Sequence, residues 1–500
     1  MVIPRSVAIG GEKILYRLLN SPVVHACSKT QSQCSTLKQL APANVLEPHD
    51  AAYGSRQAAY FAQQNAGLHP TCRYLPDGAE DLKVALRQVI DSETKFAVQA
   101  GGHSYNLGGS NIDQGITFDL SRLSKTQLTD DGSAAWVGPG SRWGEVYSAL
   151  EPHGVTIPGG RVSDVGVGGY VLGGGFSWYS SQLGWVCDSV LEFEVVTPDG
   201  GIVYASPDQH EDLFWALKGS LGAFGIVTNI KLPVVQDKEI YGGSMVYESA
   251  QAPELLTALE HLANNADQDP STQGIFNLIW NRSQKQRIYN VNLLNTKCDA
   301  SAAAIANWTA IPSLMNVLHS TTIGQVTQEL IPADFAKQRR NKFAITARST
   351  KEVIDFIHSS YLDVTSNHTE LNAPGDSIVI TVQPLTRPHL AASAKGGNIF
   401  PLDDSEGTLL ILTGELYWDD ASQDEFYHLQ SRKLHDAWVE QLSVMGVMTG
   451  WIYPNYAGAW QETLSEARLG KETAEKLRQV SERYDGQGAW KRLVPGIWHV

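Results

Sequence analysis

The chain has 500 residues, which is more than one hydrophobic core usually holds, so we expect two domains. Hydrophobic residues make up 42% and charged residues 18%, a globular mixture that excludes a disordered chain. The formal net charge of −15 argues against nucleic acid as a partner, and no apolar run approaches the roughly 20 residues of a membrane span.

Residues 1–60 show no clear period, and we expect an irregular N-terminal segment. Residues 61–235 alternate between strand and helix patterns and form the first predicted domain. We expect helices at 79–90, 143–150 and 212–218, and strands at 72–76, 96–100, 116–120, 134–137, 190–197, 201–204 and 225–232.

Residues 236–447 form the second predicted domain, an antiparallel sheet with helices on one face. We expect strands near 241–247, 274–280, 287–294, 377–383 and 408–418, and helices near 252–265, 299–306, 350–360 and 421–444. Residues 448–500 contain a loop, a charged helix at 464–483 and an aromatic tail, and we expect this segment to return to the first domain.

Two glycine-rich motifs carry the strongest functional signal. Phe96–Ser104 runs from an apolar strand into Gly101 and Gly102 and then presents His103 at the turn. Gly166–Gly175 holds six glycines in ten residues, a density that allows the backbone to lie flush against a ligand or to donate several N–H groups to a pyrophosphate. Neither motif has the Gly-x-Gly-x-x-Gly spacing of a Rossmann site, and no pattern indicates a metal site.

Together these motifs resemble the berberine-bridge-enzyme-like branch of the vanillyl-alcohol-oxidase superfamily, whose FAD-binding domain is of the PCMH type. The resemblance rests on Ala100–Ser104, Gly159–Gly169, Leu172–Gly175, Phe224–Thr228 and Tyr453–Tyr456, which stand in the family's order. The Gly-Gly-Arg-Val and Gly-Trp-Val-Cys-Asp variants are most similar to fungal members of secondary metabolism. The implied fold is α+β, with a two-subdomain FAD-binding domain and a substrate domain.

The resemblance implies FAD bound covalently through His103. Many relatives have a second link through a cysteine, but Val162 occupies that position here, so we predict a single link. Tyr170 replaces a histidine and Ala223 an asparagine of the family, so those contacts differ. The implied cofactor-binding residues are Gly101, Gly102, His103, Ser104, Gly138, Gly160, Val162, Val165, Gly166, Gly168, Gly169, Tyr170, Gly173, Gly174, Gly225, Ile226, Val227 and Asn455.

The resemblance also pairs Cys34 with Cys72 in a disulfide. The compartment stays open, because charged residues interrupt the N-terminus where a secretory signal would need an apolar run, yet sequons occur at Asn281, Asn307 and Asn367. The oligomeric state stays open as well.

We expect an oxidoreductase in which a small, apolar substrate gives a hydride to flavin N5 and dioxygen reoxidises the flavin. Alternation along residues 408–418 places Thr413, Glu415 and Tyr417 on one face, and Glu415 is the favoured proton acceptor. Tyr456, which matches a family residue near the flavin, is the rival acceptor. A cyclase that forms rings with or without oxidation, and a non-catalytic flavin-binding protein, are the alternatives.

Overall fold

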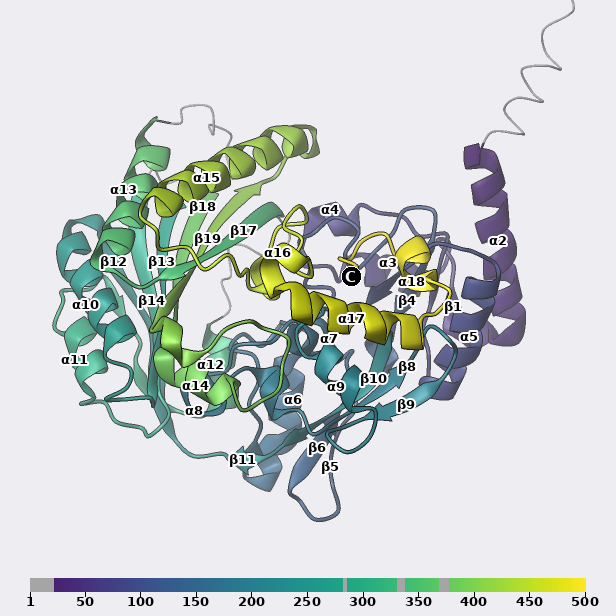
Figure 1. The fold of residues 1–500 in the computed structure, drawn as a ribbon, viewed down its shortest axis with the longest axis horizontal. Helices are drawn as coiled ribbons and strands as arrows, with labels where there is room; N and C mark the ends of the chain where they lie inside the picture. The colour runs from purple at the N-terminus through teal and green to yellow at the C-terminus, as the bar shows by residue number, and fades with distance from the viewer. Residues whose placement is uncertain (1–21, 282–285, 331–337, 368–376) are drawn as a thin grey trace, which may run out of the picture.

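The computed structural model describes residues 22–281, 286–330, 338–367 and 377–500. Two lobes lie side by side, one formed by the first part of the chain and one by a large sheet with its helices (Figure 1). The architecture is the α+β class expected from the sequence. None of the helices within these ranges is long and apolar enough to cross a membrane.

The first lobe contains two sheets. The four-stranded sheet has the order β1-β2-β4-β3, and β3 and β2 both run parallel to β4. Its strands are β1 (Val45–Leu46), β2 (Cys72–Tyr74), β3 (Phe96–Gln99) and β4 (Ile116–Asp119), and its helices are α2 (Pro22–Leu40), α3 (Ala51–Gln57), α4 (Gln63–Ala66) and α5 (Ala79–Asp91).

The second sheet of this lobe is antiparallel, with the order β5-β6-β10-β8-β9. Its strands are β5 (Thr126–Leu128), β6 (Ala134–Val137), β8 (Glu192–Val196), β9 (Ile202–Ala205) and β10 (Ile226–Pro233). The helices of this region are α6 (Trp143–Leu150), α7 (Val167–Leu172), α8 (Ser180–Leu183) and α9 (Glu211–Leu217), and β7 (Val155–Thr156) pairs with β11 (Val235–Gln236).

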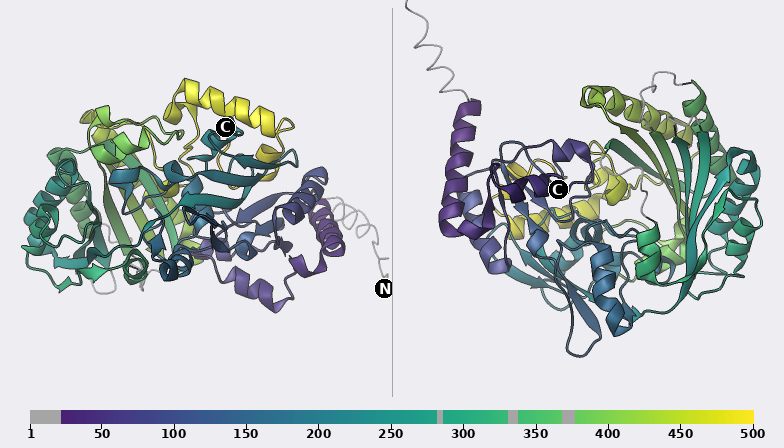
Figure 2. Two further views of the ribbon diagram at one scale, coloured as in Figure 1. Left: turned by 90° about the horizontal axis from the view of Figure 1, so that it is seen from below. Right: turned by 180° about the vertical axis from the view of Figure 1, so that it is seen from behind.

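The second lobe is an antiparallel sheet of eight strands with the order β15-β12-β14-β13-β18-β19-β17, in which β16 also pairs with β12. The strands are β12 (Ile240–Glu248), β13 (Thr272–Asn281), β14 (Gln286–Asn295), β15 (Met315–Asn316), β16 (His319–Thr321), β17 (Arg339–Arg348), β18 (Ser377–Leu385) and β19 (Leu409–Trp418). Helices α10 (Ala252–Asn264), α11 (Ala303–Thr309), α13 (Lys351–Asn367) and α15 (Asp424–Val444) cover its outer face, so the inner face is turned toward the first lobe (Figure 2).

Two shorter helices, α12 (Ile323–Glu329) and α14 (Arg387–Ser393), pack against α6 and α8 of the first lobe. The C-terminal segment also returns there through α16 (Glu466–Leu469), α17 (Lys471–Tyr484) and α18 (Ala489–Leu493). Trp490 of α18 donates from Nε1 to the carbonyl of Gly222 at 3.0 Å and packs on Phe96 at 5.4 Å between ring centroids. The chain therefore crosses between the lobes more than once.

Three expectations need correction. The segment expected to be irregular contains two helices, α2 and α3. Cys34 and Leu37 of α2 are fully buried, Cys34 is disulfide-bonded to Cys72, and Tyr53 of α3 is buried as well. Residues 339–348 form strand β17, which the sequence pattern did not predict. The glycine run 166–175, where the sequence pattern predicted no helix, contains the short helix α7.

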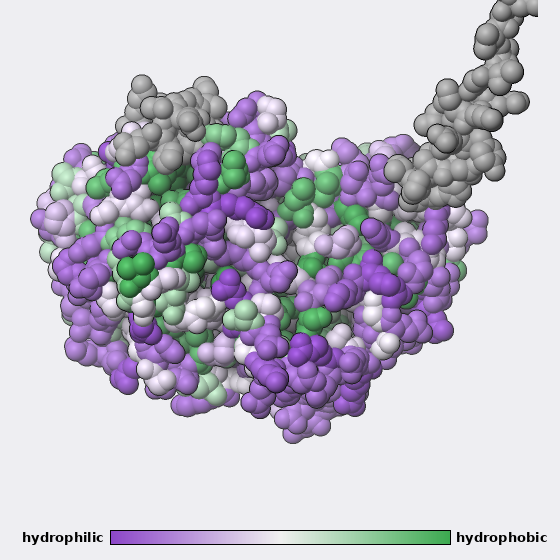
Figure 3. All heavy atoms as spheres, turned by 45° about the horizontal axis from the view of Figure 1, so that its top comes forward, coloured by the Kyte–Doolittle hydropathy of each residue, from purple (hydrophilic) through white to green (hydrophobic). Residues whose placement is uncertain are grey.

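The predicted Cys34–Cys72 disulfide is confirmed. Of the three sequons, Asn307 lies half-buried in α11, and the side chains of Asn281 and Asn367 are outside the described residues. On the face drawn in Figure 3, hydrophilic side chains predominate and hydrophobic residues lie in small separate groups.

Candidate active site

A cavity of about 550 Å³ lies where the two lobes and the C-terminal segment meet. The first lobe contributes the turn after β3 and the glycine run around α7, and the inner face of the sheet contributes β17 and β19. The C-terminal segment contributes residues 454–457, Ala459, Trp490 and residues 494–498. Residues separated by more than 300 positions in the sequence therefore share one cavity.

His103 lies at the wall of this cavity and is held by an aromatic stack. Its ring lies on that of Phe61 with centroids 3.6 Å apart, and the guanidinium carbon of Arg340 is 3.6 Å from the centroid of the same Phe61 ring. Nε2 of His103 is 3.8 Å from Oδ1 of Asp164. The imidazole thus has a defined orientation while part of it still faces the cavity.

The surroundings of His103 keep its imidazole neutral. Burial lowers its pKa to about 3, and the positive charges of Arg340, Arg142 and Lys342 act in the same direction. A neutral imidazole keeps the nitrogen lone pair that a covalent bond to a cofactor requires. The environment therefore suits His103 to the attachment role implied by the resemblance.

The two glycine motifs meet at one point of the cavity wall. A Cβ built on Gly166 would lie 2.4 Å from the Cα of Gly101, and a Cβ on Gly101 would lie 2.3 Å from the Cα of Gly166. Side chains cannot be accommodated at that distance, so both positions need glycine for close contact between the backbones. The turn carrying His103 is consequently held directly against the loop before α7.

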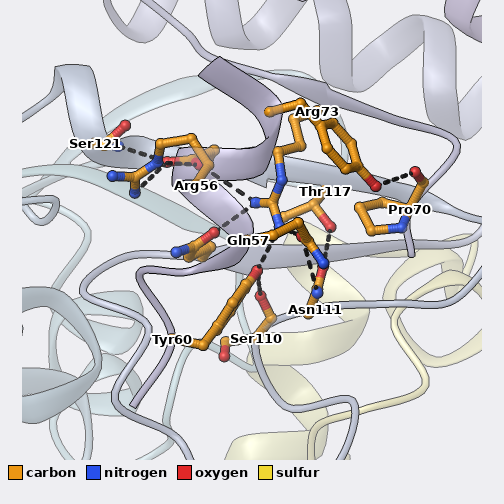
Figure 4. Close-up of polar contacts among 12 residues, drawn as sticks. Arg56, Gln57, Tyr60, Pro70, Arg73, Ser110, Asn111, Thr117 and Ser121 are labelled. Atoms are coloured by element: carbon orange, nitrogen blue, oxygen red, sulfur yellow. Dashed lines mark hydrogen bonds and ion pairs between the residues drawn. The ribbon is translucent and has the colours of Figure 1, made fainter. Parts of the chain in front are cut away.

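A buried polar network is centred on Arg73 (Figure 4). Arg73 of β2, which is fully buried, donates from Nη1 to Gln99 at 2.6 Å, pairs with Asp119 at 3.3 Å, and donates from Nη2 to Tyr60 at 3.2 Å. Gln99 and Tyr60 lie against Gly102, where a Cβ would come within 3.0 and 3.4 Å of their side chains. The network therefore links the core of the first sheet to the residue that precedes His103.

The cavity offers donors of the kind that a dinucleotide needs. Within the part of the chain that the structure describes, the backbone N–H groups of residues 101–105 donate to no protein acceptor. The buried Ser110 Oγ, also at the cavity wall, has no protein partner there. Consecutive free amides form a concave site for pyrophosphate, so these residues fit FAD.

The opposite wall is formed by paired residues of the sheet. In the register of β17 and β19, Arg340 faces Tyr417 and Lys342 faces Glu415. Lys342 Nζ lies 3.4 Å from Glu415 Oε2, and both residues are less than a tenth exposed. Burial and the adjacent Glu415 carboxylate raise the pKa of Tyr417 well above its usual range. Tyr417 is therefore a hydroxyl donor, and Glu415 is an ion-paired carboxylate on the cavity face.

Tyr456 joins the C-terminal segment to both lobes. Its hydroxyl accepts a hydrogen bond from Nη2 of Arg161 at 3.2 Å, and Lys342 Nζ lies 4.0 Å from its ring centroid. The neighbouring Asn455 donates from Nδ2 to the carbonyl of Tyr170 at 2.9 Å. The glycine run, the sheet and the C-terminal segment are thus joined by direct polar contacts.

The structure brings most of the residues predicted from the sequence to this cavity. Those that line it are Gly101, Gly102, His103, Ser104, Val162, Val165, Gly166, Gly168, Gly169, Tyr170, Gly225, Ile226, Val227, Glu415, Tyr417, Asn455 and Tyr456.

Four predicted glycines lie behind the cavity wall and serve packing instead. A Cβ on Gly138 would meet the backbone of Leu123, and one on Gly160 would meet the Trp143 ring. Gly173 is similarly close to Asn455, and Gly174 to Phe400.

Sequence reasoning missed several cavity residues, above all Lys342, Tyr105 and Arg161. Lys342 lies on the unpredicted strand β17, so its position depended on strand register. Arg161 stands within the Gly-Gly-Arg-Val motif used for the resemblance, and its position in that motif was the signal that could have identified it.

Comparison with known proteins agrees with this geometry. Residues 70–206 match the family described as FAD binding domain. The chain is 31% identical over 476 residues to an FAD-dependent monooxygenase of Emericella nidulans, which covers 93% of this chain and 98% of the relative.

Solved structures share the fold. Xylooligosaccharide oxidase from Myceliophthora thermophila C1 superimposes with a TM-score of 0.74 at 19% identity, covering 94% of this chain and 99% of that one. Glucooligosaccharide oxidase from Acremonium strictum, described with a 6-S-cysteinyl, 8α-N1-histidyl FAD, has a TM-score of 0.73 at 20% identity with the same coverage. On its motifs, its fold and its relatives, the chain belongs to the berberine-bridge-enzyme-like family of FAD-linked oxidoreductases.

Proposed function

We propose that this oxidoreductase holds FAD through one covalent bond from His103 and oxidises a small, mainly apolar metabolite, with dioxygen as the final electron acceptor. One observation carries the proposal: the His103 turn and the Lys342–Glu415 pair face the same cavity from opposite lobes. A cofactor anchored on one wall and a proton acceptor on the other is the arrangement that such an oxidation needs.

The first lobe would hold the cofactor. His103 supplies a neutral nitrogen, and the free amides of residues 101–105 suit the pyrophosphate. Val162 lines the cavity where a doubly linked relative has cysteine, so this position supplies no thiol for a second bond. When bound, FAD supplies a hydride acceptor at N5 and passes two electrons to dioxygen, which is released as hydrogen peroxide.

The second lobe would take the proton. As a substrate C–H bond delivers its hydride, the O–H or N–H group next to it loses a proton, and Glu415 accepts this proton on the cavity face. Lys342 holds the carboxylate in place at 3.4 Å. Tyr417 and Tyr456 border the same space and would orient the substrate by hydrogen bonding. The apolar side chains around them would limit the access of water.

The attachment is tested with His103→Ala. Wild-type protein precipitated with acid should keep the visible absorption of flavin in the pellet, and its intact mass should exceed the chain mass by one FAD. The variant should bind FAD but release it on precipitation. If the wild-type protein releases all its flavin in acid, the covalent bond is refuted, and if it never binds FAD, the proposed function is refuted.

The proton acceptor is tested by rapid mixing under anaerobic conditions. Glu415→Gln should slow flavin reduction at least about 100-fold, because a positioned general base contributes a factor of that order. Tyr456→Phe should slow it less. Thr413→Val is the matched control, because Thr413 lies on the same strand and face but does not line the cavity. Unchanged reduction in Glu415→Gln would exclude this residue.

A second candidate function comes from the name of the Emericella relative, monooxygenase. In that reaction one atom of dioxygen enters the product and the other leaves as water, at the expense of a further electron donor. Turnover under ¹⁸O₂ separates the two functions. Oxidation by hydride transfer yields one peroxide per product and no label, whereas monooxygenation labels the product. Product formed without dioxygen and without flavin reduction would instead support the cyclase.

A further inference from the structure

The cavity contains a buried cation whose charge no carboxylate balances. Arg161 is only 5% exposed and lines the cavity. Nη1 donates to Gln383 Oε1 at 2.8 Å and Nη2 to the Tyr456 hydroxyl at 3.2 Å, and neither acceptor is a carboxylate. Among the described residues, none of the carboxylates forms an ion pair with Arg161.

Two other buried cations of the chain have a carboxylate partner, whereas Lys218, which lies outside the cavity, donates to the carbonyl of Gly396. Arg73, fully buried, pairs with Asp119, and Lys342 pairs with Glu415. Burying a charge without a counter-ion costs free energy. We therefore expect a cavity that contains such a cation to bind an anion there. Arg161 is therefore a cavity cation that has no carboxylate partner among the described residues.

The guanidinium is also held in a fixed position. Its central carbon lies 5.0 Å from the ring centroid of Phe176 and 5.4 Å from that of Trp178. Gln383 belongs to β18 and Tyr456 to the C-terminal segment, so three parts of the chain fix its orientation. A planar guanidinium fixed in this way is suited to an oxygen anion, to which it can donate two parallel hydrogen bonds.

We propose that Arg161 is a specificity-determining residue that binds an anionic oxygen of the substrate, such as a carboxylate or the ionised oxygen of an enol or phenol. This inference rests on the proposed function and narrows the substrate class from apolar metabolites to those that carry an acidic oxygen. The formal charge of the chain is −15, so its overall field does not favour anions. The preference must come from a local cation at the site.

The test uses benzoate and its neutral analogue benzamide as probes of the purified flavoprotein, with perturbation of flavin absorption as the readout. Benzoate should bind the wild-type protein at least about tenfold more tightly than benzamide, since a hydrogen-bonded charge contributes about that factor. Arg161→Gln should lose this preference while its benzamide affinity is unchanged. Arg161→Lys should retain part of it, which also controls for folding.

Arg432→Gln is the matched control, because Arg432 stacks on the Trp460 ring at 5.2 Å but is exposed and outside the cavity. It should leave the benzoate affinity unaltered. Equal benzoate affinity in the wild type and in Arg161→Gln overturns the inference. If, in addition, the flavin reduction potential shifts in Arg161→Gln, Arg161 interacts with the cofactor and not with the substrate.

The two proposals fail in distinguishable ways. A protein that takes up no FAD refutes the proposed function, and quenching of tryptophan fluorescence by benzoate then still tests Arg161, since Trp178 lies beside it. A protein that binds and reduces its flavin but shows no preference for benzoate refutes the anion site alone.

Discussion

The close contact between Gly101 and Gly166 predicts a steric cost of substitution that differs from the usual conformational effect of replacing a glycine. In Gly166→Ala the new Cβ would lie 2.4 Å from the Gly101 Cα, whereas ordinary contacts begin near 3.4 Å. The two loops would have to separate by about 1.0 Å. The backbone of Gly166 has φ −74° and ψ 148°, which alanine adopts freely, so the cost is steric.

Overpacking of this kind costs about 1–3 kcal/mol, and we expect the urea midpoint of the flavin-free protein to fall accordingly. His103 follows Gly101 by two residues, so the same displacement should slow covalent flavin attachment by up to about 100-fold. Attachment is measured as acid-stable flavin absorption against time after FAD is added to the flavin-free protein.

Gly169→Ala is the matched control, because Gly169 belongs to the same run and lines the cavity but a Cβ there would meet no protein atom within 4 Å. Its flavin-free form should unfold at the wild-type midpoint or slightly above it, since alanine favours the helix. Its FAD affinity should fall, because the methyl group occupies cofactor space. Equal stability of Gly166→Ala and wild type would refute the steric argument, and equal destabilisation of both variants would assign the effect to the glycine backbone.

Three further predictions concern stability. Removing the Cys34–Cys72 disulfide by double substitution to serine should lower the free energy of unfolding by about 4 kcal/mol, since it closes a loop of 38 residues, and urea titration measures the loss. Burial lowers the pKa of His389 to about 3, so on acidification the unfolded chain takes up the proton first. His389 should therefore contribute a fall in stability of about 1.4 kcal/mol per pH unit between roughly pH 6 and 3, and His389→Leu should reduce the measured slope by that amount; an unchanged slope contradicts the assignment. Asp119→Asn should cost about 3–5 kcal/mol because it leaves Arg73 charged and buried, and a loss below 1 kcal/mol would show that the network of Figure 4 is relaxed by water.

Local pattern and motif order were enough to predict much of the molecule. Apolar periodicity located α5, α6 and most strands, because their spacing depends on neighbours in the chain. Alternation along β19 placed Glu415 and Tyr417 on one face, and both line the cavity. The resemblance identified His103, the glycine run and the Cys34–Cys72 pair.

The remainder depends on contacts between distant residues. Strand β17 begins with charged and polar residues that show no apolar alternation, and it becomes a strand because β19 pairs with it. That register, and not any local signal, brings Lys342 to Glu415. Likewise, the role that we propose for Arg161 follows from its contacts with Gln383 and Tyr456, which lie more than 200 positions away and are not carboxylates. Sequence by itself therefore predicted which residues form the wall that carries His103, because their motifs are contiguous in the chain. Tertiary structure decided the opposite wall, because strand pairing and burial set its charges.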